Sequence, residues 1–203
     1  MIIGLIGQKR VGKDTVASLI KEFVDNEYKC MALADPIKDI ARIMFNFSEK
    51  QLYEAEKDEI DNKWNIKPRE FFEQFGTDIM QFDIYKYLPA IASTVPPRKF
   101  WVMSLLSKIT KNDKIIITDI RGQHEIEEIQ KFNPNAIFIR IVRPSTQSIQ
   151  TTLPTQPTQP TQPNHITQLE PNQISDEFIT ETIINNGTID DLREKIIDFF
   201  LYL

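Results

Sequence analysis

The sequence predicts an α/β fold in three layers, in which a parallel sheet of about five strands lies between two layers of helices. Short apolar runs, each about as long as one buried strand, alternate along the chain with segments whose apolar residues recur at helical spacing. Strands that are apolar almost throughout are typical of parallel sheets with helices on both faces. The 203 residues, 41% of them hydrophobic, suit a single domain over residues 1–203.

The elements are expected in a regular order. Apolar runs predict strands at 2–6, 29–34, 114–118, 136–142 and 182–184. Amphipathic segments predict helices at 13–24, 68–82, 123–132 and 190–202. The dense alternating charge of 48–64 predicts a further, exposed helix. Within 68–82, the apolar stripe consists of Phe71, Phe72, Phe75 and Ile79.

Composition excludes several classes of protein. The one cysteine, Cys30, has no partner for a disulfide within the chain, and two separated histidines do not make a Cys/His-rich metal site. No apolar stretch has the length of a membrane span, and the first residues are too short a run for a signal peptide, so a cytoplasmic protein is expected. A net charge of −5 argues against a protein that coats nucleic acid.

Charge is unevenly distributed along the chain. No Lys or Arg occurs from Pro144 to Leu192, whereas the nearly neutral remainder holds all the arginines, an arrangement that suits small anionic ligands. The acidic segment contains a threefold Thr-Gln-Pro repeat at 153–164, which is expected to be extended because proline at every third position forbids a helix. The repeat is either an expanded loop without function or a docking site for a proline-binding partner.

The segment GQKRVGKDT at 7–15 is the most informative in the chain. Gly7 and Gly12 enclose four residues, Lys13 follows at once, and the segment joins a predicted strand to a predicted helix. Glycines let successive N–H groups point at an anion, the helix N-terminus adds partial positive charge, and the lysine reaches the outer phosphates. The sequence therefore predicts a three-layer P-loop fold that binds the polyphosphate of a nucleotide.

The loop departs from the usual pattern at one position. Asp14 stands where a Ser or Thr usually follows the lysine, and the hydroxyl comes one place later, at Thr15. Lys9 and Arg10 supply positive charge that offsets the Asp14 carboxylate. The chain has no G-x-G-x-x-G, which disfavours a dinucleotide-binding fold, and no Asn-Lys-x-Asp, which disfavours a GTP-specific switch protein.

Together with later blocks, the loop resembles the phage and viral deoxynucleoside monophosphate kinases and, more distantly, animal-type phosphomevalonate kinases. The blocks follow in order: LADPIK (33–38), PREFFEQFGTD (68–78), TDIRGQHEIEEI (118–129), IRIVRP (139–144) and INNGTIDDL (184–192). The resemblance implies an adenylate-kinase-like fold with a helical acceptor-binding insert at 36–100 and a lid-like segment at 144–175. It also implies transfer of a phosphoryl group from ATP, with Mg²⁺, to a deoxynucleoside monophosphate, in the host cytoplasm if the source is viral.

The resemblance implies the following roles on the donor side. ATP is bound by Gly7, Lys9, Arg10, Gly12, Lys13, Asp14 and Thr15. The transferring group is stabilised by the catalytic residues Lys13, Arg10, Arg121 and Arg143. Thr15 and Asp119 hold Mg²⁺, since Asp119 ends a predicted strand as a metal-binding acid in such kinases does. The turn at 185–187 lies near the adenine or is a plain turn.

On the acceptor side, the implied substrate-binding residues are Asp35, Lys38, Arg69, Gln74, Phe75, Gly76, Trp101, Asp119 and Arg121. Asp35 and Arg69 seat the acceptor: Arg69 clamps its phosphate, and Asp35 either orients that phosphate through water or Mg²⁺ or binds the sugar. Phe75, Gly76 and Gln74 shape the base pocket. Other interpretations stay open: Asp35 as a helix N-cap before Pro36, Arg69 as an ordinary surface arginine, and Trp101 as a core residue.

The lid-like segment after Pro144 has no arginine, although many monophosphate kinases deliver arginines from a lid. Three functions therefore stay open. The chain is a deoxynucleoside monophosphate kinase, a kinase of another phosphorylated acceptor (phosphomevalonate or dephospho-coenzyme A), or a catalytically inactive nucleotide-binding scaffold. The expected partner is a small-molecule nucleotide; a homodimer is left open, and neither nucleic acid nor a membrane is expected.

Overall fold

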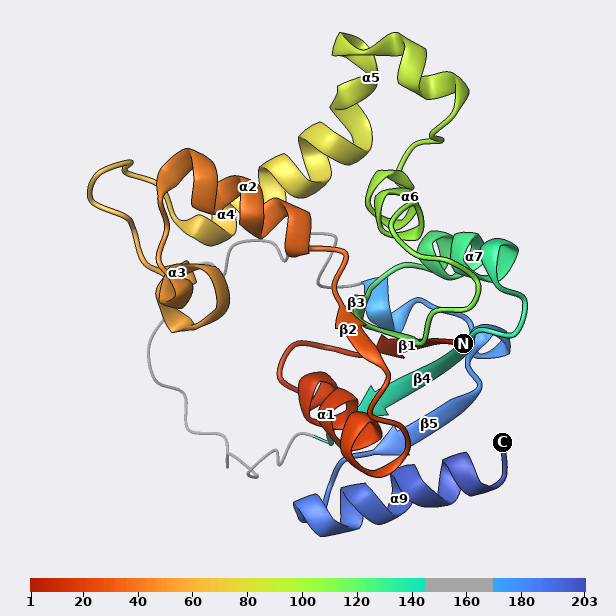
Figure 1. The fold of residues 1–203 in the computed structure, drawn as a ribbon. Coiled ribbons are helices and arrows are strands. Elements are labelled where there is room, and N and C mark those ends of the chain that lie inside the picture. Colours follow the sequence, from red (N-terminus) through yellow and green to blue (C-terminus); the bar gives the residue numbers. More distant parts are fainter. Residues whose placement is uncertain (145–169) are drawn as a thin grey trace, which may run out of the picture.

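A computed structural model describes residues 1–144 and 170–203. At its centre, five strands form a parallel sheet in the order β2-β3-β1-β4-β5 (Figure 1). These strands are β1 (Ile2–Ile6), β2 (Lys29–Met31), β3 (Ile115–Ile120), β4 (Ile137–Val142) and β5 (Glu181–Ile184). The predicted three-layer α/β fold with a parallel sheet is confirmed.

Helices cover both faces of the sheet. Helices α1 (Lys13–Phe23) and α9 (Ile189–Leu201) pack on one face, and α6 (Phe100–Leu106) and α7 (Gln123–Phe132) pack on the other (Figure 1). Successive side chains of a strand point to opposite faces, so Ile3 and Leu5 of β1 join the core beneath α1, whereas Ile2 and Ile6 join the core beneath α6. An apolar strand thus contributes to two cores at once.

A helical insert separates β2 from β3 and stands beside the sheet (Figure 1). Before α6 it consists of α2 (Asp35–Phe45), α3 (Glu49–Tyr53), the 3₁₀ helix η1 (Ala55–Asp58), α4 (Pro68–Glu73), the π-helix η2 (Gln74–Asp83), α5 (Ile84–Tyr87) and the 3₁₀ helix η3 (Pro89–Ser93). The insert has a small core of its own around Ala41, Phe47 and Leu52. Its η2 segment contacts α6, and apolar side chains of α4 and η2 pack on the core beneath α6.

Two predictions about the insert were wrong in detail. Residues 48–64 do not form one exposed helix: α3 ends at Tyr53, where Glu54 is extended, and η1 is a single 3₁₀ turn. After it, the Asp61 carboxylate accepts the N–H groups of Lys63 and Trp64 in a local turn that takes the place of helical hydrogen bonds. The helix predicted at 68–82 exists, but its second half is a π-helix. The altered periodicity takes Ile79 off the apolar stripe and leaves it 40% exposed.

The strand predicted at 29–34 ends at Met31. The carboxylates of Asp35 and Asp119 accept the N–H groups of residues 32–34, which a longer strand would have given to a neighbouring strand. The predicted lid-like segment at 144–175 and its Thr-Gln-Pro repeat fall mainly on residues 145–169, outside the described residues. Beyond them, two short 3₁₀ helices, η4 (Glu170–Asn172) and η5 (Asp176–Phe178), lead into β5. Within the described ranges, every helix is too short or too polar to cross a membrane.

Candidate functional site

Most of the predicted site residues meet at one edge of the sheet, where the carboxyl ends of the parallel strands lie together. The phosphate loop follows β1, Asp35 follows β2, Asp119 lies near the end of β3, Arg143 follows β4 and Asn185 follows β5. In open α/β sheets, ligands bind in the crevice at this edge. The fold therefore gathers segments that are far apart in the sequence into one candidate site.

The phosphate loop, residues 7–13, requires glycine at its two ends. Gly7 has a φ of +152° and Gly12 a φ of +104°, a region that favours glycine. A Cβ at Gly7 would lie 2.5 Å from the carbonyl oxygen of Ile141, and a Cβ at Gly12 would lie 2.5 Å from Nδ2 of Asn185. Both the backbone conformation and the close neighbours thus exclude a side chain at these positions.

Lys13 holds its ammonium group over the loop. Its Nζ donates to the carbonyl oxygens of Gly7, at 2.9 Å, and of Gln8, at 2.8 Å. Burial lowers the pKa of Lys13, and the nearby Arg121 guanidinium lowers it further, whereas Asp14 and Asp119 act in the opposite direction. The lysine is therefore a partly buried cation, electrostatically coupled to both charged residues that end β3.

Arg10 is held in a left-handed backbone conformation, with a φ of +66°. This conformation costs a non-glycine residue roughly 1–2 kcal/mol, and strain of this kind is concentrated at functional sites. The Arg10 side chain is exposed, as is that of Asp14, whereas Thr15 is half-buried in the first turn of α1. All the residues predicted to bind ATP lie on this loop and turn.

Asn185 fastens the loop to the sheet. Its buried side-chain Nδ2 donates to the carbonyl oxygen of Val11 at 2.9 Å, and its backbone N–H donates to the carbonyl oxygen of Val142 at 2.7 Å. The neighbouring Asn186 is exposed and accepts a hydrogen bond from Lys195. The turn after β5 is therefore more than a plain turn, because Asn185 holds the phosphate loop against the sheet.

Asp119 is half-buried and joins β3 to the start of the insert. Its two carboxylate oxygens accept the N–H groups of Leu33, at 2.7 Å, and Ala34, at 3.0 Å. Burial raises the pKa of Asp119, while Arg121 and the two backbone N–H groups oppose that rise. The carboxylate therefore has a positioning role that its place at a strand end did not reveal.

The two residues predicted to hold Mg²⁺, Thr15 and Asp119, have donor atoms that suit this ion. Mg²⁺ is usually bound by one or two carboxylates together with water and substrate phosphates, and each Asp119 oxygen keeps a lone pair beyond the N–H bond that it accepts. No group of three or more His, Cys, Asp or Glu side chains in residues 1–144 and 170–203 is placed to hold a metal. Thr15 and Asp119 would supply protein oxygens to the ion.

Glu125 fixes the backbone that carries Arg121. Its Oε2 accepts the N–H groups of Arg121, at 2.7 Å, and Gly122, at 3.0 Å, at the start of α7. Burial raises the pKa of Glu125 to about 7. Burial also lowers the pKa of the adjacent His124 to about 4. Arg121 itself is exposed at the edge of the sheet.

On the acceptor side, Asp35 is the first residue of α2, and its carboxylate accepts the N–H of Ala32 at 2.8 Å. Because that bond lies before the helix, Asp35 does not act as a side-chain N-cap. One turn later, Lys38 has its Nζ 4.2 Å from the centre of the Tyr53 ring and lies within electrostatic range of Asp119. Asp35 and Lys38 therefore border the same edge as the phosphate loop.

Arg69, at the start of α4, is brought next to the phosphate loop. Its guanidinium donates to both carboxylate oxygens of Asp58, and Nζ of Lys9 lies 3.8 Å from the same carboxylate. Asp58 thus links an arginine of the insert to a lysine of the loop. Sequence reasoning missed Asp58, whose acidic side chain did not stand out in the charge-rich stretch around it.

Trp101 and the three residues predicted to shape a base pocket contact other residues of the protein; these three are Gln74, Phe75 and Gly76. Trp101 is only 6% exposed, and its Nε1 donates to the carbonyl oxygen of Gly76 at 2.6 Å. A Cβ at Gly76 would lie 2.7 Å from Cδ1 of Ile37, so glycine allows η2 to pack closely on α2. Phe75 stacks on another phenylalanine ring of the same helical segment, and Gln74 bonds to a glutamate one turn earlier. In this conformation Trp101 is a core residue.

The two arginines of β4 and its end have different surroundings. Arg140 pairs with Asp176 and donates to the carbonyl oxygen of Ile174 at 2.6 Å, so it fastens the segment before β5 to the sheet. Arg143 is exposed just beyond β4, at the same edge as the phosphate loop. Of the two, Arg143 alone lies where it can face a phosphate.

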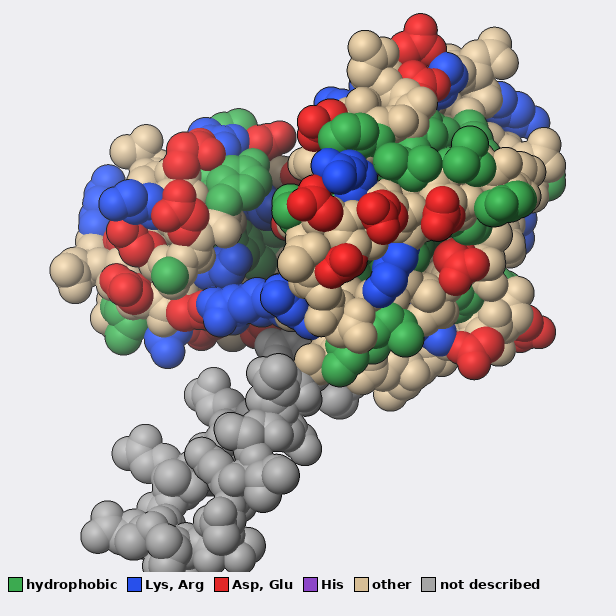
Figure 2. Space-filling view, turned by 90° about the horizontal axis from the view of Figure 1, so that it is seen from below, with side chains coloured by type: hydrophobic (Ala, Val, Ile, Leu, Met, Phe, Trp, Pro, Cys, Tyr) green, Lys and Arg blue, Asp and Glu red, His purple; other side chains and the backbone are tan. Residues whose placement is uncertain are grey.

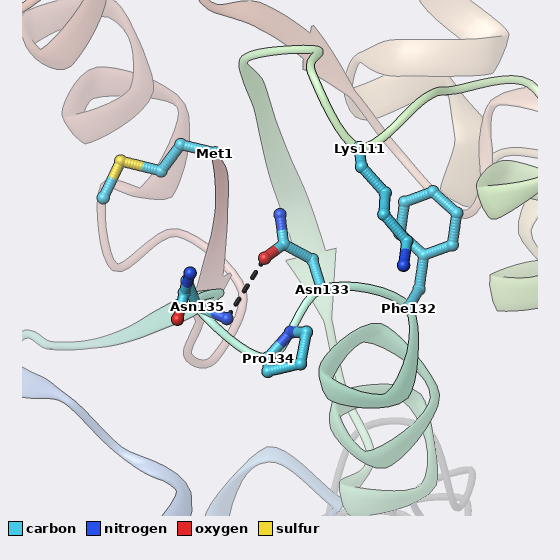
Figure 3. Close-up of a pocket in the computed structure, with 6 residues that line it drawn as sticks. All are labelled: Met1, Lys111, Phe132, Asn133, Pro134 and Asn135. Carbon is cyan, nitrogen blue, oxygen red and sulfur yellow. Dashed lines mark hydrogen bonds between the residues drawn. The ribbon is translucent and has the colours of Figure 1, made fainter.

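A separate pocket of about 470 Å³ lies at the opposite, amino edge of the sheet (Figure 3). It is lined by Met1, Lys111, Phe132, Asn133, Pro134 and Asn135. Met1 precedes β1 and Asn135 precedes β4, whereas the phosphate loop follows β1. This pocket therefore forms no part of the candidate site.

The parallel sheet and its phosphate loop together define a P-loop protein. The chain matches the family model for deoxynucleotide monophosphate kinase over residues 1–59 and 41–196, and it belongs to that family. No curated protein sequence matches it.

Solved structures with a similar fold include three kinases. A gluconokinase from Sinorhizobium meliloti 1021 has a TM-score of 0.47 at 10% identity, with 98% of this chain and 91% of that chain covered. An unliganded sugar kinase from Janibacter sp. HTCC2649 has a TM-score of 0.41 at 11% identity, with coverage of 98% and 93%. A dephospho-CoA kinase from Campylobacter jejuni has a TM-score of 0.42 at 13% identity, with coverage of 98% and 95%.

Proposed function

We propose that the protein transfers the terminal phosphoryl group of ATP to a deoxynucleoside monophosphate, which gives a deoxynucleoside diphosphate and ADP. The observation that carries this proposal is the phosphate loop, whose Lys13 ammonium interacts electrostatically with Asp119, near the end of β3, and with Arg121, just after it. Membership of the family supports the choice of a deoxynucleotide as acceptor.

Phosphoryl transfer requires alignment of donor and acceptor and neutralisation of the charge on the transferring group. The loop N–H groups and the N-terminus of α1 face the donor phosphates, and Lys13 and Arg121 supply positive charge beside them. Arg10 and Arg143, both exposed at this edge, add charge from the loop and from the end of β4. When bound, Mg²⁺ neutralises phosphate charge, with Thr15 and Asp119 as its protein partners.

The acceptor is placed between the loop and the insert. Arg69 has the planar fork that grips a monophosphate with two hydrogen bonds, and its neighbour Lys9 belongs to the donor loop. Asp35 and Lys38 border the space from α2. An acceptor phosphate held by Arg69 would therefore lie beside the donor phosphates, as an in-line transfer requires.

An acceptor panel tests the proposal. ADP release is measured with the four common deoxynucleoside monophosphates, phosphomevalonate and dephospho-coenzyme A, and turnover is expected with at least one deoxynucleotide. Lys13→Met, which keeps a side chain of similar length without its charge, is expected to abolish turnover and to retain the circular dichroism spectrum.

Three other outcomes would count against the proposal. Turnover only with phosphomevalonate or dephospho-coenzyme A would change the acceptor, and tight ATP binding without turnover on any acceptor would identify a nucleotide-binding scaffold. Full activity of Lys13→Met would refute the assignment of the phosphate loop itself.

A further inference from the structure

A group of charged side chains lies between the phosphate loop and the insert, and the proposed function uses only part of it. Lys9 comes from the loop, Lys57 and Asp58 come from η1, and Arg69 comes from α4. Figure 2 shows Lys and Arg side chains gathered where the smaller, helical part of the molecule, at the left, faces the larger sheet body. We call Lys9, Lys57 and Arg69 the cation cluster.

Asp58 lies among the three cations. Nε and Nη2 of Arg69 donate to its two oxygens, the latter at 3.1 Å, and Nζ of Lys9 lies 3.8 Å from one of them. Lys57, the residue before Asp58, has its Nζ on the carbonyl oxygen of Tyr53 at 3.4 Å, and its charge lowers the pKa of Asp58 less than Arg69 and Lys9 do. One carboxylate therefore serves several cations.

The cations are incompletely neutralised. Burial lowers the pKa of Lys9 and of Lys57, and in both cases the positive charge of Arg69 lowers it further. Asp58 opposes these shifts without removing them, and Glu73, one turn further along α4, adds its negative charge beside Arg69. Such a cluster would be stabilised by a ligand that brings more negative charge than one carboxylate.

We infer that the cation cluster is the receptor for the phosphate of the acceptor nucleotide, and that Asp58 is a placeholder that occupies the Arg69 fork until this phosphate displaces it. The inference rests on the proposed function. A guanidinium fork fits carboxylate and phosphate oxygens with the same paired geometry. A phosphate monoester carries between one and two negative charges near pH 7, so the exchange improves neutralisation of the cluster.

The position of Asp58 allows this exchange. Its side chain is 46% exposed at the end of a single 3₁₀ turn, so it can move aside into solvent without repacking a core. While it is in place, it holds Arg69 and Lys9 together in the geometry that a phosphate would use. Asp58 thus holds the cations in place and also competes with the acceptor phosphate for the guanidinium of Arg69.

Equilibrium binding without ATP tests the inference. Inorganic phosphate and the four common deoxynucleoside monophosphates are titrated calorimetrically into the wild type, Asp58→Asn and Glu56→Gln. Glu56 is the matched control, because it is an acid of the same 3₁₀ turn that pairs with Lys50 instead. Asp58→Asn is expected to tighten binding by roughly two- to fivefold, the range of a partly exposed ion pair, and Glu56→Gln is expected to change it little.

Two further variants make the inference falsifiable. Lys57→Gln and Arg69→Gln are expected to weaken binding, and the effect of Asp58→Asn is expected to persist in a Lys13→Met background, where the phosphate loop has lost its lysine. Unchanged or weaker binding by Asp58→Asn, or loss of its effect in that background, would overturn the placeholder role. Because no ATP is present, these binding results are independent of the acceptor panel. Tighter binding by Asp58→Asn together with no turnover in the panel would refute only the proposed function. Turnover in the panel without tighter binding by Asp58→Asn would refute only this inference.

Discussion

Replacing Asn185 by alanine removes the side chain that clamps the phosphate loop to the sheet. The lost hydrogen bond joins Nδ2 of Asn185 to the carbonyl oxygen of Val11 at 2.9 Å, in a buried position. The backbone bond from Asn185 to Val142 is kept, so β5 is expected to stay in register. The change therefore affects the loop more than the fold.

The magnitude follows from the burial of the partner. A buried carbonyl left without its donor costs about 1–3 kcal/mol, so Asn185→Ala is expected to lower the free energy of unfolding by roughly 2 kcal/mol. The loop would also lose its fixed distance from the sheet, and a displacement of about 1 Å in such a site is enough to cost up to roughly 100-fold in rate. We expect kcat/KM for ATP to fall at least tenfold.

Urea unfolding and steady-state kinetics of Asn185→Ala and Asn186→Ala measure these effects. Asn186 is the matched control, because it is exposed and accepts only a 3.2 Å bond from Lys195. Its replacement is expected to change the free energy of unfolding by less than about 0.5 kcal/mol. Equal stability and equal kinetics of the two variants would refute the clamp.

Three other changes have definite expected results. The pKa of Glu125 is about 7 in the folded protein and 4.5 in the unfolded chain, so its contribution to stability falls as pH rises through that interval. The free energy of unfolding of the wild type minus that of Glu125→Gln, measured in urea, is thus expected to decrease by roughly 3 kcal/mol from pH 4.5 to 7. A difference that does not change with pH would contradict this. His124 has the opposite effect on stability between pH 4 and 6.5, but both proteins contain it, so its contribution cancels in the difference. Gly12→Ala is expected to abolish ATP binding in calorimetry, because its Cβ would lie 2.5 Å from Nδ2 of Asn185; normal affinity would show that the loop adapts. Asp119→Asn turns an NH₂ group towards a backbone N–H and is expected to cost about 1–3 kcal/mol in urea unfolding; wild-type stability would argue that the carboxylate is not needed there.

The sheet could be predicted from the sequence because its three central strands, β1, β3 and β4, are mostly buried. Isoleucine-rich runs such as 115–117 are buried on both faces of the sheet, between two layers of helices. Because helices alternate with these strands along the chain, parallel pairing is expected, and the structure has it. The insert could be predicted only in outline. Its turns are decided by single polar side chains, such as Asp61, and the change to a π-helix at Gln74 has no signature in the apolar pattern.

The candidate site shows the same division. The phosphate loop could be recognised because the spacing of its glycines and lysine depends only on the local backbone conformation. The structure shows both glycines in conformations that exclude side chains. Contacts between distant segments were not evident. Asn185 reaches Val11 across 174 positions, and Asp58 meets Lys9 only because the insert folds back beside the loop.

Transfer of label from ATP tests the central claim most directly. The protein is incubated with ATP labelled at the γ-phosphorus and with each deoxynucleoside monophosphate, and the products are separated by charge. We predict that label appears in a deoxynucleoside diphosphate with wild-type protein and not with Lys13→Met. Label found only in inorganic phosphate, or retained in ATP that is demonstrably bound, would contradict the claim that this phosphate loop serves phosphoryl transfer to a nucleotide.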